Sequence, residues 1–356
     1  MMLDLNGKTV LVTGSAGFIG ANLITRLMDE MESGHIISID NMNDYYDPKL
    51  KEWRLHKITA KSENKNVSNM FVKADISNES DIAFLFDTFH VDIVVNLAAQ
   101  AGVRYSIQCP EKYIQSNVVG FLNILEACRS HNVKHLVYAS SSSVYGGNKK
   151  IPFSTDDNVD KPESMYAVTK KMNELMAHVY SKIYGLPTTG LRFFTVYGPA
   201  GRPDMFYYSA TEKLVRGEKI KIFNHGNMKR DFTYIDDIVE GIIRVMKKPP
   251  EKGVDSDGTV VPPYAVYNIG GGNPENLLDF ITVLQEELIQ AGVLPEDYDF
   301  EAHKEFADMQ LGDVPVTYAD TTKFERDFGF VPKVKIREGL REFAKWYFQF
   351  TNSEGK

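Results

Sequence analysis

The chain has 356 residues, of which 43% are hydrophobic and 25% are charged, and 40 basic against 48 acidic side chains give a formal charge of −8. This composition is typical of a globular protein with a substantial core, and it excludes collagen, coiled coil and a disordered chain. The negative balance argues against nucleic-acid binding as the main activity, and no apolar run approaches the roughly 18 residues of a membrane span. Two cysteines, Cys109 and Cys128, form no C-x-x-C motif, so we expect reduced thiols. The N-terminus lacks a signal-peptide pattern, and we therefore expect a cytoplasmic protein.

Five short apolar runs are expected to form buried strands, and helical patterns lie between them. The runs are residues 9–13, 35–39, 70–74, 91–97 and 135–139. The clearest helical pattern covers residues 114–129, and apolar residues also recur at helical spacing directly after the first run. Alternating strands and helices predict an α/β fold of the Rossmann type, in which a doubly wound parallel sheet is covered on both faces.

Proline and glycine become frequent beyond about residue 191. We expect residues 1–190 to form the Rossmann domain and residues 191–356 to form mainly a smaller, mixed lobe, with some C-terminal segments returning to the first domain. The ligand crevice should lie where this lobe meets the carboxyl ends of the strands.

A glycine loop joins the first expected strand to the first expected helix. Gly14, Gly17 and Gly20 permit a tight turn, close approach of the backbone to a pyrophosphate and close helix packing, while the helix start offers N–H groups to the anion. Asp40, about 20 residues further on, can accept hydrogen bonds from ribose hydroxyls and would repel a 2′-phosphate, so the sequence predicts NAD rather than NADP. Asp75, at another strand end, is either an adenine ligand or a strand-end cap.

A second candidate site lies further along the chain. Tyr166 and Lys170 are four residues apart in an expected helix and therefore share a face. A tyrosine with a pKa near 10 is a poor base at neutral pH, but a nearby ammonium and a positive nicotinamide ring favour the phenolate. Such a pair can take a proton from a sugar hydroxyl while hydride leaves the same carbon. The serines 140–143, at the end of the fifth run, supply hydroxyls opposite this helix.

These motifs together resemble the extended short-chain dehydrogenase/reductases that act on nucleotide sugars. The resemblance covers essentially the whole chain and rests on the loop at 13–20, Leu97-Ala98-Ala99, the segment 143–146, Tyr166 with Lys170, and residues 229–237. It implies that Ser141 and Ser142 join Tyr166 and Lys170 as catalytic residues. The expected NAD ligands are Gly14, Gly17, Phe18, Ile19, Gly20, Asp40, Asn41, Asp75, Ile76, Leu97, Ala98, Ala99, Gln100, Asn117, Tyr166 and Lys170. The resemblance also implies that the 191–356 lobe binds a nucleotide sugar, and that the chain is a homodimer through helices at 107–129 and 166–184.

Three segments, 43–55, 101–106 and 192–205, resemble UDP-glucuronate 4-epimerases in particular. Related dehydratases carry an Asp-Glu pair directly after the catalytic hydroxyl and related decarboxylases carry a Glu, whereas this chain has Ser142 and Ser143 there. Elimination then lacks its proton carriers, and oxidation followed by re-reduction at C4 remains. We expect reversible conversion of UDP-glucuronate to UDP-galacturonate through a 4-keto intermediate, with NAD tightly bound. The alternatives are a 4-epimerase of a neutral UDP-hexose or UDP-N-acetylhexosamine, or a non-catalytic NAD(H)-binding scaffold.

The expected substrate ligands include several cations. Arg202 is the candidate clamp for the sugar carboxylate, because a guanidinium can hold a carboxylate with two bonds, and Arg230 is the candidate pyrophosphate ligand. The remaining expected substrate ligands are Arg104, Ser142, Ser143 and Thr195. Gln310 stands near a position where related epimerases often have an arginine, so the second phosphate contact is either neutral or supplied by another cation. The eight histidines show no metal-ligand spacing, and we expect no metal, no nucleic-acid partner and no membrane contact.

Overall fold

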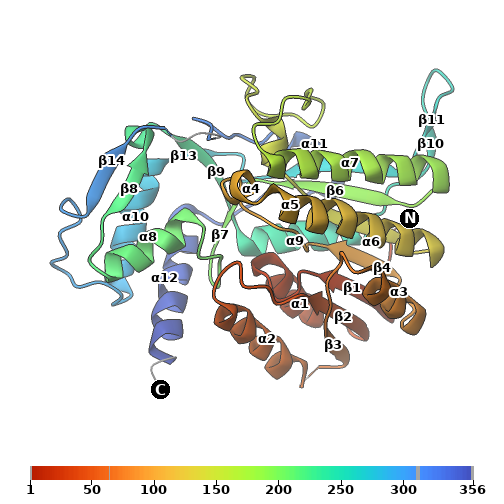
Figure 1. Ribbon diagram of the computed structural model, residues 1–356, viewed down its shortest axis with the longest axis horizontal. Coiled ribbons are helices and arrows are strands. Elements are labelled where there is room, and N and C mark those ends of the chain that lie inside the picture. The colour runs from red at the N-terminus through yellow and green to blue at the C-terminus, as the bar shows by residue number, and fades with distance from the viewer. Residues whose placement is uncertain (1, 64, 310–312, 354–356) are drawn as a thin grey trace.

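A seven-stranded parallel sheet forms the centre of the molecule (Figure 1). The computed structural model describes residues 2–63, 65–309 and 313–353. The strands lie in the order β12-β6-β5-β4-β1-β2-β3, and every neighbouring pair runs parallel. Their bounds are β1 Lys8–Thr13, β2 Gly34–Asp40, β3 Val67–Lys73, β4 Ile93–Asn96, β5 His135–Ser141, β6 Thr188–Phe193 and β12 Tyr264–Ile269. The five predicted strands are therefore present, and the predicted doubly wound α/β fold is confirmed.

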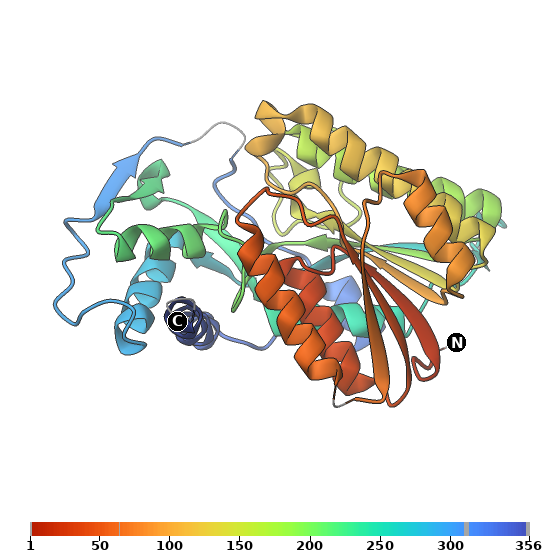
Figure 2. The ribbon, with the colours of Figure 1, turned by 60° about the horizontal axis from the view of Figure 1, so that its bottom comes forward.

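Helices cover both faces of this sheet (Figure 2). One face packs against α1 (Phe18–Glu30), α2 (Pro48–Ser62) and α9 (Ile235–Met246), and the other against α3 (Glu79–Thr88), α6 (Gly120–Ser130) and α7 (Met165–Tyr184). Side chains alternate along β1, so that Val10 and Val12 join the first core and Leu11 joins the second. Both cores are apolar, as expected for a parallel sheet buried on two sides.

The helix expected over residues 107–129 is interrupted. Its parts are α4 (Tyr105–Gln108), α5 (Pro110–Tyr113), the π-helix η1 (Ile114–Val119) and α6. Cys109 is non-helical, with φ −133° and ψ 62°, because Pro110 disfavours the helical conformation in the residue before it. By contrast, α7 is continuous: the Ser164 hydroxyl accepts the backbone N–H of Ala167 at its start, and Gly185 ends it with a φ of 72°.

The C-terminal lobe is smaller and mixed, as predicted (Figure 2). It contains the sheet β13-β9-β7 and the parallel pair β8–β14, with helices around them. The bounds are β7 Thr195–Tyr197, α8 Phe206–Val215, β8 Ile220–Phe223, β9 Lys229–Tyr234, β13 Pro274–Asn276, α10 Leu277–Gln290, β14 Lys304–Ala307 and α12 Ile336–Ser353. The short helices η2 (Ser142–Tyr145) and η3 (Asn224–Gly226), the hairpin strands β10 (Gly253–Val254) and β11 (Val260–Val261), and α11 (Thr322–Phe328) complete the chain.

The C-terminal half also contributes to the central sheet. The boundary expected at residue 190 falls inside β6, and β12 pairs with β6 as the last strand of the sheet. Helix α9 packs against α1 and β5, on the face of the sheet that α1 and α2 also cover. Within the described residues, no helix is long and apolar enough to cross a bilayer.

Candidate active site

The strand order of the sheet reverses between β1 and β4, since β1 continues to β2 while β4 continues to β5. Ligands of open α/β sheets bind outside the carboxyl ends of the strands at such a point. A cleft of about 860 Å³ lies there. It is lined by the glycine loop after β1, by residues 97–100 after β4, by the serines that follow β5, and by residues of the C-terminal lobe. The sequence motifs thus meet in one cleft.

The glycine loop leaves no room for side chains. A Cβ on Gly14 would lie 2.7 Å from the backbone nitrogen of Ala98, and one on Gly20 would lie 2.2 Å from the Gly14 carbonyl oxygen. Gly14 also has a φ of +69°, a conformation that other residues rarely adopt. Helix α1 begins at this loop without a side-chain cap, so its first N–H groups remain available to an anion. This cradle fits the pyrophosphate of a dinucleotide.

Two carboxylates stand where the nucleoside end of such a cofactor would lie. Asp40 ends β2, lines the cleft, and accepts hydrogen bonds from the backbone N–H groups of Ala16 and Met42 at 3.2 and 2.9 Å. Lys51 Nζ, which the sequence did not suggest, is 3.4 Å from the same carboxylate. Asp75 accepts from Asn41 Nδ2 at 2.9 Å and from Ser77. Burial raises the pKa of Asp75, but these hydrogen bonds outweigh it and hold that pKa below its ordinary value.

Asp75 caps the turn after β3 and also lines the cleft, and its role as an adenine ligand stays a prediction. Asn41 lies beside it at the cleft wall, and the other expected NAD ligands of the first domain also line the cleft except Asn117.

Asn117 lies behind the cleft wall. Its side chain accepts from the backbone N–H of Gln100 at 2.7 Å and donates to the Gln100 carbonyl at 3.0 Å. It is buried in the π-helix η1, and its own carbonyl accepts from Asn173 of α7. In this structure Asn117 fixes the loop after β4 rather than facing the cofactor position directly.

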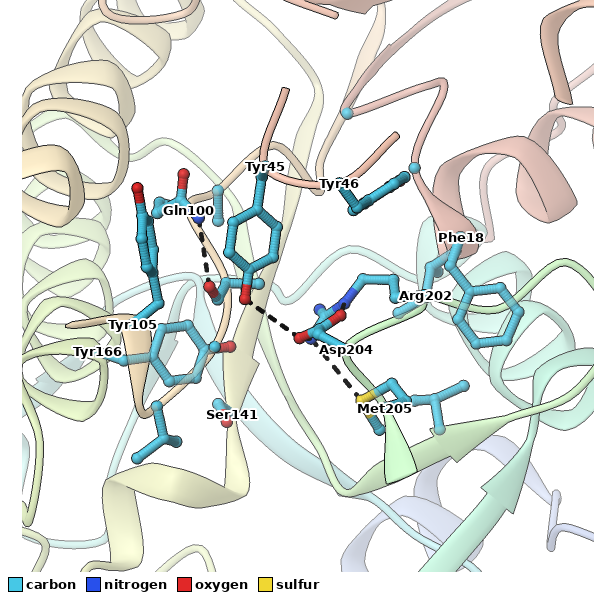
Figure 3. A pocket seen from close by; sticks show the side chains of 18 of the residues that line it. Phe18, Tyr45, Tyr46, Gln100, Tyr105, Ser141, Tyr166, Arg202, Asp204 and Met205 are labelled. Carbon is cyan, nitrogen blue, oxygen red and sulfur yellow. Dashed lines mark hydrogen bonds and ion pairs between the residues drawn. The ribbon is translucent and has the colours of Figure 1, made fainter. Parts of the chain in front are cut away.

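The predicted catalytic pair, Tyr166 and Lys170, belongs to α7 and lines the same cleft. Lys170 is buried, donates to the Ala139 carbonyl at 2.7 Å, and has its Nζ 5.9 Å from the centroid of the Tyr166 ring. Burial lowers the pKa of Lys170 to about 8. Tyr166 and Ser141 lie close together in the cleft (Figure 3), and the Ser141 hydroxyl donates to that of Ser143 at 3.1 Å.

The electrostatic setting of Tyr166 differs from the simple picture drawn from its spacing to Lys170. Burial raises the pKa of the phenol, while the positive charge of Arg202 and the hydrogen bond from Ser141 lower it. The net result is a pKa above the ordinary value. The residues of the chain alone therefore hold Tyr166 protonated at neutral pH, and the positive ring of a bound oxidised nicotinamide is the further charge that would favour the phenolate.

Most of the expected substrate ligands line the same cleft. Ser142, Ser143, Thr195, Arg202 and Arg104 all line it. The two serines offer hydroxyls and no carboxylate at this point of the cleft. The Arg104 guanidinium lies 5.3 Å from the centroid of the Phe223 ring.

Arg202 is already paired. Its Nε and Nη2 each lie 2.9 Å from an oxygen of Asp204, whose carboxylate also accepts from the Tyr45 hydroxyl at 3.2 Å (Figure 3). The sequence reasoning missed Asp204, Tyr45 and Lys51 as cleft residues, although each lies inside a segment that carried the family resemblance.

Arg230 does not line the cleft. Its Nη2 lies 2.6 Å from Asp313, which does line the cleft, and its Nη1 donates to the Pro315 carbonyl at 3.2 Å. Gln310 lies outside the described residues. Two lysines that the sequence did not single out, Lys213 of α8 and Lys221 of β8, stand on the lobe side of the cleft and add positive charge there. No group of three or more potential ligands within the described ranges could hold a metal ion.

The parallel sheet, the glycine loop at its switch point and the Tyr166–Lys170 pair opposite Ser141 define an extended short-chain dehydrogenase/reductase. The model of the NAD dependent epimerase/dehydratase family matches residues 10–270. The chain belongs to this family, and the resemblance noted in the sequence is confirmed.

Individual relatives match over nearly the whole chain. Protein CapI of Staphylococcus aureus is 49% identical over 96% of this chain and 98% of its own length. UDP-glucuronate 4-epimerase 4 of Arabidopsis thaliana is 42% identical over 99% of this chain and 78% of its own length. The crystal structure of UDP-glucuronic acid 4-epimerase from Bacillus cereus, in complex with UDP-glucuronic acid and NAD, is 31% identical with a TM-score of 0.81, covering 96% of this chain and 99% of that one.

Proposed function

We propose that this protein is an NAD-dependent UDP-glucuronate 4-epimerase, which interconverts UDP-glucuronate and UDP-galacturonate through a 4-keto intermediate. The observation that carries the proposal is the composition of the cleft around Tyr166. It combines an acid–base tyrosine, hydroxyls at Ser142 and Ser143 in place of elimination carboxylates, and a guanidinium at Arg202. Relatives with this activity in their names are 42% identical to the chain, and a solved one contains both UDP-glucuronic acid and NAD.

The chain holds the cofactor through the glycine loop, the strand-end carboxylates and the Tyr166–Lys170 helix. The loop fits a pyrophosphate because α1 begins there without a side-chain cap and leaves N–H groups for the anion, while Gly14 and Gly20 let the backbone pack closely. Asp40 and Asp75 would hold the nucleoside portion, and Lys170 the nicotinamide ribose. When bound, NAD supplies reversible hydride transfer at C4 of the sugar, and since it is regenerated in each turnover it stays on the enzyme.

Tyr166 moves the proton. As the phenolate, which the positive ring of bound oxidised nicotinamide would favour, its oxygen takes the proton of the C4 hydroxyl as the 4-keto sugar forms. The keto sugar then turns about its pyrophosphate linkage and presents its opposite face. Tyr166 returns the proton to the C4 oxygen, and the configuration at C4 is inverted. Ser141 supports this exchange by hydrogen-bonding the reacting oxygen.

The carboxylate of the sugar must be restrained during the keto stage. A 4-keto uronate is a β-keto acid, which loses CO₂ when the bond to its carboxylate aligns with the carbonyl π system. Arg202 holds the carboxylate out of this alignment with its planar fork, assisted by the hydroxyls of Ser142, Ser143 and Thr195. Positive charge for the pyrophosphate comes from three residues that line the cleft, Arg104, Lys213 and Lys221. Arg230 adds to this charge from behind Asp313, the cleft residue with which it is paired.

Replacing Arg202 tests the substrate assignment. Arg202→Ala should lower kcat/KM for UDP-glucuronate about 100-fold, since losing charge-assisted hydrogen bonds costs about 3 kcal/mol, and should leave activity on a neutral UDP-hexose much less changed. Arg216→Ala, which removes an exposed arginine paired with Glu218, is the matched control and should be neutral. Intact activity of Arg202→Ala on UDP-glucuronate would contradict the proposed role of Arg202 and remove the argument that it makes for a uronate substrate.

We also propose a cytoplasmic homodimer. The outer faces of α6 and α7 expose apolar side chains at Leu122, Leu175, Val179 and Ile183, the last with 64% of its surface accessible. Both cysteines are free, which suits a reducing compartment. Light scattering should give a mass twice that of one chain, and Ile183→Asp should shift this mass toward that of a single chain. Cell fractionation should find the protein in the soluble fraction. A monomeric wild type would contradict the homodimer, and a membrane-bound protein would contradict the cytoplasmic location.

A further inference from the structure

The guanidinium that is expected to clamp the sugar carboxylate already holds a carboxylate of the protein. Asp204 takes Nε and Nη2 of Arg202, both at 2.9 Å, in a bidentate pair (Figure 3). The pair is not sealed in the core: 27% of the Arg202 side chain and 29% of the Asp204 side chain are accessible, and both residues line the cleft. A ligand entering the cleft can therefore reach it.

A uronate carboxylate and Asp204 cannot both use Arg202 well. If the sugar carboxylate bound only the Nη1 side, it would have to share Nη2 with Asp204. Two carboxylates, with a total charge of −2, would then face one guanidinium of charge +1. The net charge would be −1, and the two negative groups would lie at close range. Like charges at such distances repel, and more strongly in a cleft shielded from water.

Asp204 has a second partner that remains when Arg202 is withdrawn. The Tyr45 hydroxyl donates to Oδ2 of Asp204 at 3.2 Å. The Tyr45 ring is itself held in place, because its centroid lies 5.2 Å from that of Tyr105 and 6.2 Å from that of Tyr46. These contacts keep the hydroxyl where it can satisfy a released Asp204 carboxylate.

From this geometry we propose that Asp204 is an internal competitor for the uronate carboxylate: it occupies Arg202 in the free enzyme and passes to Tyr45 when the substrate takes its place. Asp204 is thus a specificity-determining residue that acts through Arg202. The inference rests on the proposed role of Arg202 as the carboxylate clamp. A neutral sugar should then gain nothing from Arg202, since such a sugar has no group that can displace Asp204.

The exchange has a measurable consequence for affinity. A ligand that binds only the open form has an apparent affinity reduced by the fraction of molecules that are open. A partly exposed, well-aligned ion pair shifts such an equilibrium by about fivefold. Removing the negative charge at position 204 should therefore tighten the binding of UDP-glucuronate by about fivefold and leave the binding of UDP-glucose unchanged.

The test is calorimetric titration of NAD-loaded enzyme in a Tyr166→Phe background, which binds substrate without converting it. Asp204→Asn should tighten UDP-glucuronate about fivefold and change UDP-glucose by less than twofold. Tyr45→Phe should have the opposite sign, weakening UDP-glucuronate about twofold, because the released Asp204 loses its second partner. In the double variant Tyr45→Phe/Asp204→Asn the effect of Tyr45→Phe should disappear, since no carboxylate is left to be held.

Weaker or unchanged binding of UDP-glucuronate by Asp204→Asn would overturn the proposal, and weaker binding would make Asp204 a support that orients Arg202. Equal tightening for UDP-glucuronate and UDP-glucose would also overturn it, because a general change of the cleft would then explain the result. The enzyme that retains Tyr166 separates this failure from a failure of the proposed function: if it forms UDP-galacturonate while Asp204→Asn does not bind tighter, only the role of Asp204 is wrong.

Discussion

The buried ion pair between Glu174 and Arg192 should be a major determinant of stability, because it ties the catalytic helix to the sheet. Glu174 lies one turn after Lys170 in α7 and accepts from Nε and Nη2 of Arg192 in β6 at 2.8 and 2.9 Å. It also accepts from the Ser140 hydroxyl of β5 at 2.7 Å. Only 2% of the Glu174 side chain and 3% of the Arg192 side chain are accessible.

Glu174→Ala should lower the free energy of unfolding by about 4 kcal/mol, because it leaves a buried guanidinium without its counter-charge and a buried serine without its acceptor. Urea denaturation at neutral pH, followed by far-ultraviolet circular dichroism, measures the change. Glu30→Ala is the matched control: Glu30 pairs with Arg26 at 3.1 Å with 28% of its side chain accessible, so its loss should cost less than about 1 kcal/mol. A loss at Glu174 no larger than that at Glu30 would show that the buried pair stabilises the fold no more than an exposed pair does.

Two further predictions concern the cofactor cradle and the pH dependence of stability. Gly20→Ala should purify without bound NAD, because its Cβ would lie 2.2 Å from the Gly14 carbonyl oxygen. The control Gly253→Ala, in the exposed hairpin, should retain NAD. Equal amounts of NAD in acid extracts of both variants would argue against the cradle. Burial lowers the pKa of His135 to about 4 from 6.5. The unfolded chain therefore binds more protons between these values, and stability present above pH 6.5 should fall by about 3 kcal/mol as the pH drops to 4. His135→Asn should flatten this fall in urea titrations, and an unchanged slope would show that another group causes it.

Local patterns predicted the first half of the fold well. One stretch of about twenty residues contains the apolar run at 9–13, the glycine loop and the helical spacing after it. Each motif could therefore be placed on its element. The same holds for Tyr166 and Lys170, whose spacing of four puts them on one face of α7. The strands β6 and β12 were not predicted, because they lie far apart in the sequence and their pairing is decided by packing rather than by their own patterns.

The sequence could not predict the contacts that the candidate site residues make. Spacing cannot tell which way a side chain turns, so Asn117 was expected at the cofactor and instead holds the backbone of Gln100 behind the cleft wall. Arg230 was likewise expected at the pyrophosphate and pairs with Asp313, 83 residues away in the chain. The pairing of Arg202 with Asp204 is local, two residues apart, but its meaning depends on Tyr45, which the fold brings from the other domain.

The proposed epimerase oxidises and re-reduces C4 of a UDP-uronate with a retained cofactor. The most direct test is to incubate the purified protein with UDP-glucuronate, without added NAD, and to separate the products by chromatography with mass detection. We expect a new peak of unchanged mass that co-elutes with UDP-galacturonate. A product lighter by CO₂ would contradict it, because the cleft would then fail to restrain the carboxylate, and the protein would be a decarboxylase.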